Sequence, residues 1–150
     1  MRRNFLKYLS LTIFSSFILP LNSLFANTKK IINKNLTKKQ KEIMFNEGTE
    51  MPFSSDLLRE NRKGFYHCAN CGNKLFASTS KFDSGTGWPS FSEALPGAFK
   101  TKIDYKFGMK RTEYHCAKCG AHHGHVFNDG PTKSGKRFCN NGLCLIFKPE

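Results

Sequence analysis

The chain has 150 residues, which is enough for one ordinary domain and no more. Its formal net charge is +13, a value that also occurs in nucleic-acid-binding proteins. Many of the lysines, however, fall between Lys29 and Lys41, directly after an apolar leader, where a solvated tether accounts for them. We therefore expect no nucleic-acid partner.

The first 26 residues have the order of an export signal. Arg2, Arg3 and Lys7 form a positive head, residues 8–25 carry no charge, and Ala26 ends a short sequence that a signal peptidase could cleave. A membrane anchor is the alternative, but it needs about 20 strongly apolar residues, and a proline and several polar residues interrupt this stretch. We expect the signal to be removed, which leaves no stable membrane anchor.

The positive head resembles a twin-arginine export motif, because the arginine pair is followed at the right offsets by Phe5, Leu6 and Lys7. The head is short, so a Sec signal stays open as the alternative. Twin-arginine export carries folded proteins, which suits a domain that must close around a metal before export. We expect an exported, periplasmic protein.

The segment after the signal is polar and then becomes helical. Residues 27–36 are rich in lysine and asparagine and predict a flexible linker. Thr37 and Gln40 form the pattern of a capping box, which predicts a short helix from Thr37 to Met44. A serine directly before residues 56–60 predicts a second short helix.

Beyond Gly64 the chain consists of short aromatic segments separated by turn residues, a pattern typical of β-strands. These segments are Lys74–Ala77, Ala98–Thr101, Arg111–Tyr114 and Leu143–Lys148. Fifteen phenylalanines supply large side chains for a core. We expect a mainly β fold, an antiparallel sandwich or barrel-like domain over residues 37–150 with short helices at its start, and a monomer.

Two Cys-x-x-Cys pairs, each followed by glycine, repeat along the chain as Tyr66-His67-Cys68-Ala69-Asn70-Cys71-Gly72 and Tyr114-His115-Cys116-Ala117-Lys118-Cys119-Gly120. This arrangement is typical of a zinc ribbon. A tight turn lets both thiolates of a pair point at one ion, and glycine permits the left-handed backbone that ends the turn. Four thiolates leave no open coordination position, so we expect one structural zinc ion bound by Cys68, Cys71, Cys116 and Cys119.

Three other interpretations of the cysteine pairs are weaker. Haem attachment requires histidine directly after the second cysteine, and Gly72 and Gly120 stand there instead. A thioredoxin-like motif would be a single pair beside a βαβ pattern. Two disulfides are the serious alternative in an exported protein, but the repeat favours metal; iron could use the same ligands.

Cys139 and Cys144 remain for other chemistry. Cys139 follows Lys136 and Arg137, whose charges favour a thiolate, and polar residues follow it. Cys144 lies in an apolar segment that we expect to be a strand. A buried, unreactive cysteine is an equal alternative there.

His122, His125 and Trp88 are further candidates. The two histidines stand next to glycines, which makes them poor core residues. A regular strand would place them on opposite faces, so we expect a turn to bring them together; surface or metal-supporting histidines are the alternative. Trp88 lies in a loop rich in glycine and proline, where a tryptophan is as often a pocket wall as a core residue.

Several segments in one consistent order resemble the peptide methionine-R-sulfoxide reductases of the B type, over about residues 37–148. The resemblance rests on Phe82-Asp83-Ser84-Gly85-Thr86-Gly87-Trp88-Pro89-Ser90-Phe91, Arg111-Thr112-Glu113, Cys119-Gly120-Ala121-His122, Gly124-His125-Val126-Phe127, Asp129-Gly130-Pro131 and Arg137-Phe138-Cys139 with Asn141. It implies a sandwich-like β fold and reduction of the R epimer of methionine sulfoxide in oxidised proteins or peptides.

The resemblance also implies roles for individual residues. Cys139 would attack the sulfoxide sulfur and become a sulfenic acid. His122, His125 and Asn141 would line the oxygen side as hydrogen-bond and proton donors, while Arg137 favours the thiolate. Trp88, together with Phe127, would bind the substrate, with the S-methyl group against the tryptophan ring. A thioredoxin-like reductant would restore the thiol.

The chain departs from the family pattern in its recycling residues. Many members carry a recycling cysteine where this chain has Thr86. Cys144 is the spare thiol that could replace it, and direct reduction of Cys139 by an external thiol is the alternative. His123 stands where an aliphatic residue is common. A non-catalytic zinc-ribbon module and another zinc-stapled thiol enzyme are the competing functions, although the first leaves Trp88 and the reactive residues without a role.

Overall fold

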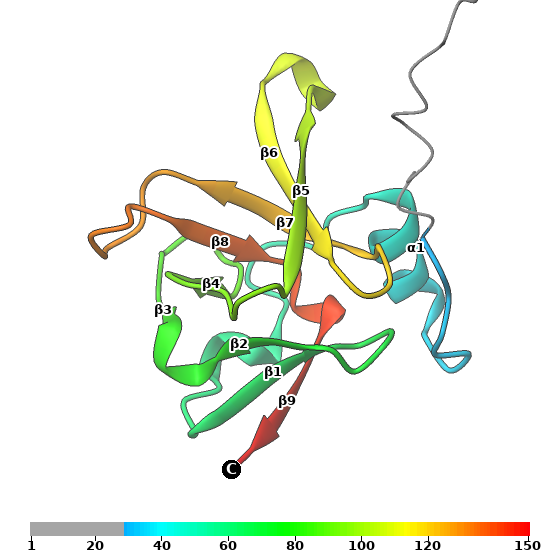
Figure 1. Ribbon diagram of the computed structural model, residues 1–150, viewed down its shortest axis with the longest axis horizontal. Helices are drawn as coiled ribbons and strands as arrows, with labels where there is room; N and C mark the ends of the chain where they lie inside the picture. Colours follow the sequence, from blue (N-terminus) through cyan, green and yellow to red (C-terminus); the bar gives the residue numbers. More distant parts are fainter. Residues whose placement is uncertain (1–28) are drawn as a thin grey trace, which may run out of the picture.

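Two antiparallel β-sheets and one α-helix make up the fold, and the computed structural model describes residues 29–150 (Figure 1). The mainly β architecture expected from the sequence is confirmed. In chain order the elements are α1 (Lys38–Asn46), β1 (Gly64–Cys68), β2 (Lys74–Ala77), β3 (Lys81–Phe82), β4 (Ser90–Phe91), β5 (Phe99–Asp104), β6 (Arg111–Cys116), β7 (His122–Phe127), β8 (Arg137–Asn140) and β9 (Leu145–Pro149).

The smaller sheet has the strand order β2-β1-β9, and the larger sheet has the order β3-β4-β8-β7-β6-β5. Aromatic rings from both sheets fill the space between them. Phe76 of β2 stacks on Phe91 of β4 with ring centroids 4.0 Å apart, and Tyr66 of β1 meets Phe91 at 4.9 Å. All three side chains are fully buried, so these rings form the core that the phenylalanine-rich composition indicated.

Helix α1 begins with the capping box that the sequence predicts. The Thr37 hydroxyl accepts from the Gln40 backbone nitrogen at 3.1 Å, and the Gln40 side chain accepts from the Thr37 nitrogen at 2.9 Å. The helix buries Ile43 and Met44 and packs against β7. The second expected helix is a shorter 3-10 helix, Asp56–Arg59, capped by Ser55.

The expectation of a flexible linker is wrong for residues 29–36. The backbone nitrogen of Lys30 donates to the Cys119 carbonyl at 3.0 Å. The nitrogens of Ile32 and Asn33 donate to the Asn70 side chain at 2.8 and 3.1 Å. The linker was predicted from the lysine-rich composition, which gives no information about backbone hydrogen bonds. These bonds hold the segment against the cysteine turns. The expected signal, residues 1–26, lies outside the described residues.

The expected strand Leu143–Lys148 begins later, at Leu145. Residues Gly142–Cys144 form a 3-10 helix, in which the Cys144 nitrogen donates to the Asn141 carbonyl at 3.0 Å. The nitrogens of Gly142 and Leu143 bind the Glu50 carboxylate instead of a neighbouring strand. Because the backbone N–H groups of Gly142 and Leu143 bind a side chain, this segment forms no strand, and Cys144 lies in a turn.

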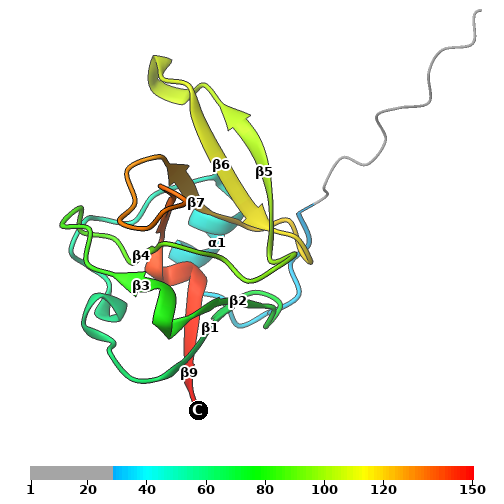
Figure 2. The same ribbon diagram turned by 60° about the vertical axis from the view of Figure 1, so that its left-hand side comes forward.

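The β5–β6 hairpin extends well beyond the rest of the domain (Figures 1 and 2). Its strands pair in register from Phe99–Cys116 to Asp104–Arg111, and the loop between them runs through Tyr105 and Phe107. Within residues 29–150 the structure contains no helix with the length and apolar character of a membrane span.

Candidate metal centre and active site

The four cysteines of the repeat meet at one point, with all four sulfurs within 4.8 Å of one another. The Sγ atoms of Cys68 and Cys119 are 3.8 Å apart, and those of Cys71 and Cys116 are 3.6 Å apart. A tetrahedral site with metal–sulfur bonds of about 2.3 Å has sulfur–sulfur edges of about 3.8 Å. The four thiols therefore fit a metal ion that is held without an open position.

Each half of the metal centre is a turn closed by glycine. The nitrogens of Gly72 and Gly120 donate to the carbonyls of Cys68 and Cys116, each at 2.8 Å. Both glycines have a φ of 71°, which is the left-handed backbone predicted from the spacing. His123 approaches this centre from β7, with its Nε2 3.4 Å from the Cys68 sulfur, and is fully buried.

Cys139 lies on β8 in a small pocket of about 130 Å³. The pocket is lined by Thr49, Trp88, Arg111, Gly124, His125, Phe127, Cys139, Asn140 and Asn141. Cys139 pairs with His125 across β7 and β8 and with Ser90 of β4. A Cβ atom at Gly124 would collide with the Cys139 carbonyl, so only glycine permits the two strands to approach at this point.

His122 and His125 lie on the same strand, β7, so the expected turn between them is wrong. The pairing of β6 with β7 shifts between Tyr114 and His115, which face Gly124 and His122. His123 is therefore the extra residue of a β-bulge. Because a bulge shifts the alternation of side chains by one position, it lets His122 and His125 share a face while His123 points to the metal centre.

Both histidines are held by carboxylates. His122 is almost fully buried, and its Nδ1 lies 2.8 Å from Glu113. His125 Nε2 lies 2.8 Å from Asp104, which also binds Arg111 at 2.6 Å. Burial lowers the pKa of His125, and the bond to Asp104 opposes this shift. His125 lines the Cys139 pocket directly, whereas His122 lines an adjoining cavity of about 390 Å³.

Burial raises the pKa of the Cys139 thiol, and the charge of Arg137 opposes this shift. The effect of Arg137 thus has the predicted sign, but burial outweighs it. Arg137 is fixed by two bonds of 2.8 Å to Asp129, and its guanidinium lies 4.6 Å from the centre of the Phe127 ring. The Thr86 side chain also acts to lower the pKa of the Cys139 thiol.

Glu50 is a site residue that the sequence did not reveal. Its carbonyl accepts from Trp88 Nε1 at 3.1 Å, and its nitrogen donates to the Asn141 side chain at 3.0 Å. Its buried carboxylate binds the backbone after Asn141. The Asn141 amide nitrogen also donates to the His123 carbonyl at 3.1 Å. Glu50 thus fixes Trp88 and Asn141 relative to each other, and no local motif marks it.

Cys144 is fully buried and does not line the Cys139 pocket. Burial raises the pKa of its thiol well above the ordinary value. The structure thus brings Cys139, His125, Asn141, Trp88 and Phe127 together, with Arg137 and His122 next to them. It places Cys144 in the core.

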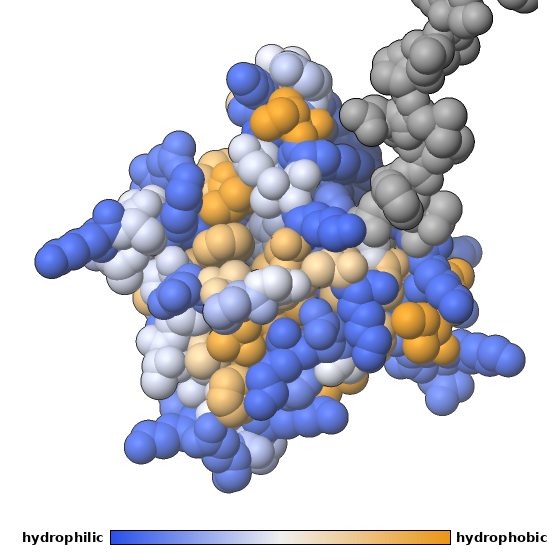
Figure 3. Space-filling view, viewed as in Figure 1, coloured by the Kyte–Doolittle hydropathy of each residue, from blue (hydrophilic) through white to orange (hydrophobic). Residues whose placement is uncertain are grey.

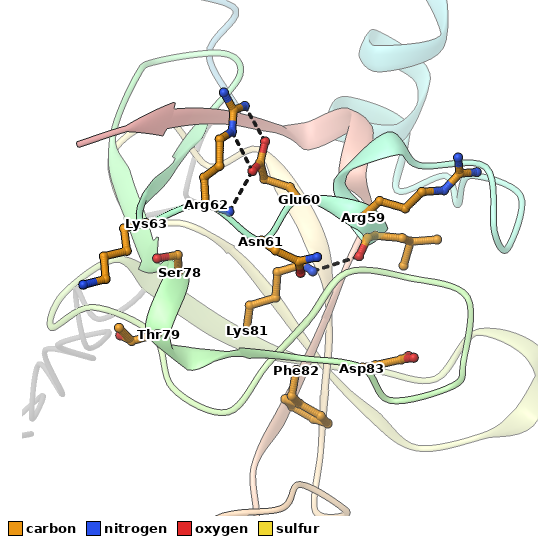
Figure 4. Close-up of a pocket in the computed structure, with 11 residues that line it drawn as sticks. Arg59, Glu60, Asn61, Arg62, Lys63, Ser78, Thr79, Lys81, Phe82 and Asp83 are labelled. Carbon is orange, nitrogen blue, oxygen red and sulfur yellow. Dashed lines mark hydrogen bonds and ion pairs between the residues drawn. The ribbon is translucent and has the colours of Figure 1, made fainter.

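A larger cleft, of about 710 Å³, lies between the Asp56–Arg59 helix and β3 (Figure 4). It contains Arg59, Arg62, Lys63 and Lys81. Lys81 donates to the Leu58 carbonyl at 2.9 Å, and Arg62 pairs with Glu60 at 2.6 Å. No cysteine, histidine or tryptophan lines this cleft, so we assign the chemistry to the smaller Cys139 pocket.

Comparisons with known proteins identify the family of this chain. A family model described as the SelR domain matches residues 36–149. "Peptide methionine sulfoxide reductase MsrB" of Methanosarcina barkeri is 48% identical over 118 residues, covering 78% of this chain and 83% of that protein. The MsrB of Variovorax paradoxus is 53% identical over 110 residues, covering 73% and 81%. That of Leptospira interrogans is 48% identical over 118 residues, covering 78% and 90%. The chain therefore belongs to the SelR domain family.

Proposed function

We propose that this protein reduces the R epimer of methionine sulfoxide, in peptides or proteins, to methionine, and that Cys139 is the nucleophile. Membership of the SelR family and the relatives named peptide methionine sulfoxide reductase support this activity. The observation that carries the residue assignment is the Cys139 pocket. In this pocket the partly exposed Cys139 thiol is lined by the aromatic rings of Trp88 and Phe127. His125, whose ring is bound to the Asp104 carboxylate, also lines the pocket.

The sulfur of a sulfoxide is electrophilic because its oxygen withdraws electrons. The Cys139 thiolate attacks this sulfur, and the oxygen gathers negative charge and takes up a proton. The bond between this oxygen and the substrate sulfur then breaks and a bond to the Cys139 sulfur forms, so that Cys139 loses two electrons and becomes a sulfenic acid, while the substrate sulfur gains two electrons and leaves as a thioether. Trp88 and Phe127 offer an apolar surface to the S-methyl group.

The histidines supply the proton in this scheme. Bonds from His122 and Lys102 outweigh burial and lower the pKa of Glu113, so Glu113 is an anion that accepts from His122 Nδ1. The Nε2 atom of His122 is then the nitrogen free for proton transfer. His125, beside Cys139, orients the oxygen, and Asn141 is fixed nearby by its backbone bonds.

The sulfenic acid must be reduced before the next cycle. One thiol condenses with it to form a disulfide and water, and a second thiol then releases Cys139. We propose a thioredoxin-like dithiol as the source of both. Recycling by Cys144 is the alternative route, and because Cys144 is buried, the Asn141–Cys144 turn would have to open first.

We propose zinc as the metal of the four-cysteine centre, because four thiolates in a tetrahedron are the ligand set that zinc prefers in structural sites. Cys68, Cys71, Cys116 and Cys119 would hold it. We also propose that residues 1–26 direct export, by a twin-arginine signal, to the periplasm; the arginine pair and the apolar stretch after it support this.

One assay tests the proposed function. The mature protein is mixed with a chemical dithiol and separate R and S epimers of a dabsylated methionine sulfoxide, and the reduced product is measured. We expect turnover of the R epimer alone. Reduction of neither epimer by metal-loaded, folded protein would contradict the proposal and favour a non-catalytic binding module.

A further inference from the structure

Exposed apolar side chains flank the Cys139 pocket on two sides. On one side are Met51 and Phe53, which are 70% and 69% exposed. On the other, at the end of the β5–β6 hairpin, are Tyr105, Phe107 and Met109, which are 69%, 86% and 57% exposed. Figure 3 shows a small apolar patch at this hairpin end, bordered by hydrophilic side chains. We call these five residues the apolar rim; nothing in the fold of residues 29–150 covers them.

The hairpin side of the rim is continuous with the catalytic pocket. The cavity of about 390 Å³ that Phe107 and Lys106 line is also lined by Thr49, Arg111 and His125. These last three residues line the Cys139 pocket as well. A groove therefore runs from Cys139 across His125 and Arg111 to Phe107.

The other side of the rim is attached to the tryptophan loop. The Phe53 nitrogen donates to the Gly87 carbonyl at 2.7 Å. A Cβ atom at Gly87 would lie 2.9 Å from that nitrogen, so the two segments are in close contact. Phe53 also lines a cavity of about 310 Å³ together with Gly87 and Pro89, the neighbours of Trp88.

The backbone holds both phenylalanines in an unfavourable conformation. Within residues 29–150, the non-glycine residues with positive φ are Glu47, Phe53 and Phe107, at 58°, 62° and 60°. All three line the groove or its extension past Trp88. Left-handed backbone at a bulky residue is costly and concentrates at functional sites. It presents each ring outward rather than into the core.

The charges along the groove are already paired, so they do not call for a charged ligand. Glu47 binds Lys102 at 2.6 Å and Lys106 at 2.9 Å. Asp104 binds Arg111, whose guanidinium lies 5.7 Å from the centre of the Phe107 ring. These pairs fix the hairpin end next to His125. The surface that stays exposed beside these pairs is made of aromatic rings and methionine thioethers. Methionine side chains are flexible and can adapt to many binding partners.

We propose that the apolar rim is a binding site for extended polypeptide, and that it favours apolar or aromatic residues on both sides of the oxidised methionine. This inference rests on the proposed function. Apolar segments are buried in folded proteins, so such a site selects unfolded or damaged chains. Phe53 and Phe107 are the specificity-determining residues, one for each flank.

The test compares two substrates with one enzyme. The first is N-acetyl-methionine-R-sulfoxide, and the second is a peptide with the same sulfoxide between phenylalanine flanks. In Phe53→Ala and Phe107→Ala we expect the ratio of the peptide kcat/KM to the small-substrate kcat/KM to fall about tenfold, through KM, since each ring loses apolar contact. Phe107→Trp should keep the ratio. Ile146→Ala removes a 45% exposed side chain on β9, outside the rim, and serves as the control.

A second measurement needs no turnover. A fluorescent peptide with reduced methionine between phenylalanine flanks is titrated with Cys139→Ser protein, with and without Phe107→Ala, and binding is followed by anisotropy. Weaker peptide binding by the Cys139→Ser/Phe107→Ala protein than by Cys139→Ser alone supports the proposed role of the apolar rim. An unchanged ratio and unchanged binding, or equal loss on both substrates, would overturn it. Rim-dependent binding by a wild-type protein that reduces neither substrate would instead contradict the proposed function alone.

Discussion

The rings of His122 and His125 meet edge to face with centroids 5.7 Å apart, although the residues are three positions apart on one strand. The bulge at His123 produces this arrangement. It also sends the His123 ring to Cys68, 3.4 Å from the sulfur. One irregularity in β7 therefore sets both the approach of His122 to His125 and the contact of His123 with the four-cysteine centre.

The His122–Glu113 pair should control the chemical step. We expect His122→Ala to lower kcat for the R epimer by about 10²–10⁴, the usual contribution of general acid–base catalysis. Glu113→Gln should also lower kcat, because an amide accepts a weaker hydrogen bond from His122 Nδ1 than a carboxylate does and holds the ring less firmly. KM should change little in either variant, and single-turnover kinetics measures the step. A wild-type kcat in both variants would remove His122 from the mechanism.

Cys139→Ser should abolish reduction, because a hydroxyl is a far weaker nucleophile than a thiolate. The side chain is partly exposed and remote from the metal cysteines in sequence, so metal content and circular dichroism should not change. Cys144→Ser serves as the matched cysteine control. Residual activity of Cys139→Ser above a few per cent would mean that another group attacks the sulfoxide.

Charges near Cys139 should move the pH dependence in opposite directions. Arg137 lowers the pKa of the thiol and Asp129 raises it. Because the thiolate reacts, activity rises as pH passes upward through this pKa. Arg137→Gln should therefore shift the rising limb to higher pH, and Asp129→Asn should shift it to lower pH. The measurement is the pH dependence of Cys139 alkylation and of kcat/KM; shifts of the same sign in both variants would contradict it.

The sequence predicted the parts of the site that repeat or that have a local pattern. The two Cys-x-x-Cys-Gly turns, the Thr37–Gln40 capping box and the short aromatic strands are local, and the structure confirms them. It missed Glu50, whose partners Asn141 and Gly142 are 91 and 92 residues away. It also missed the bulge, because an extra residue in β7 is defined only by its pairing with β6. Long-range pairing of this kind leaves no periodic signal.

Removing one thiolate from the metal centre should unfold the domain. Structural zinc supplies on the order of 10–16 kcal/mol in small zinc peptides, which is comparable to the whole stability of a small domain. We expect Cys116→Ser to lose its metal and its cooperative thermal transition, as measured by elemental analysis and circular dichroism. Cys139→Ser should keep both. Two disulfides among these four cysteines in active, metal-free protein would contradict the prediction.

The last prediction concerns how the Cys139 sulfenic acid is reduced. Cys144 is fully buried, its thiol has a raised pKa, and it lies in the turn that Glu50 holds through Gly142 and Leu143. Attack by Cys144 requires this turn to open and its buried bonds to break, whereas an external thiol reaches the partly exposed Cys139 directly. We therefore expect Cys144→Ser to keep thioredoxin-dependent turnover.

Peptide mapping separates the two routes. The reduced enzyme is oxidised with one equivalent of substrate, quenched with an alkylating agent and digested. If Cys139 is found as a sulfenic acid and Cys144 becomes alkylated once the protein is unfolded, the Cys144 thiol has not reacted with Cys139. That result supports direct reduction by an external thiol. A Cys139–Cys144 disulfide, together with loss of thioredoxin-dependent turnover in Cys144→Ser, would establish Cys144 as the recycling residue. The Asn141–Cys144 turn would then have to open once in every catalytic cycle, and Glu50→Gln, which weakens its hold on Gly142 and Leu143, should speed recycling.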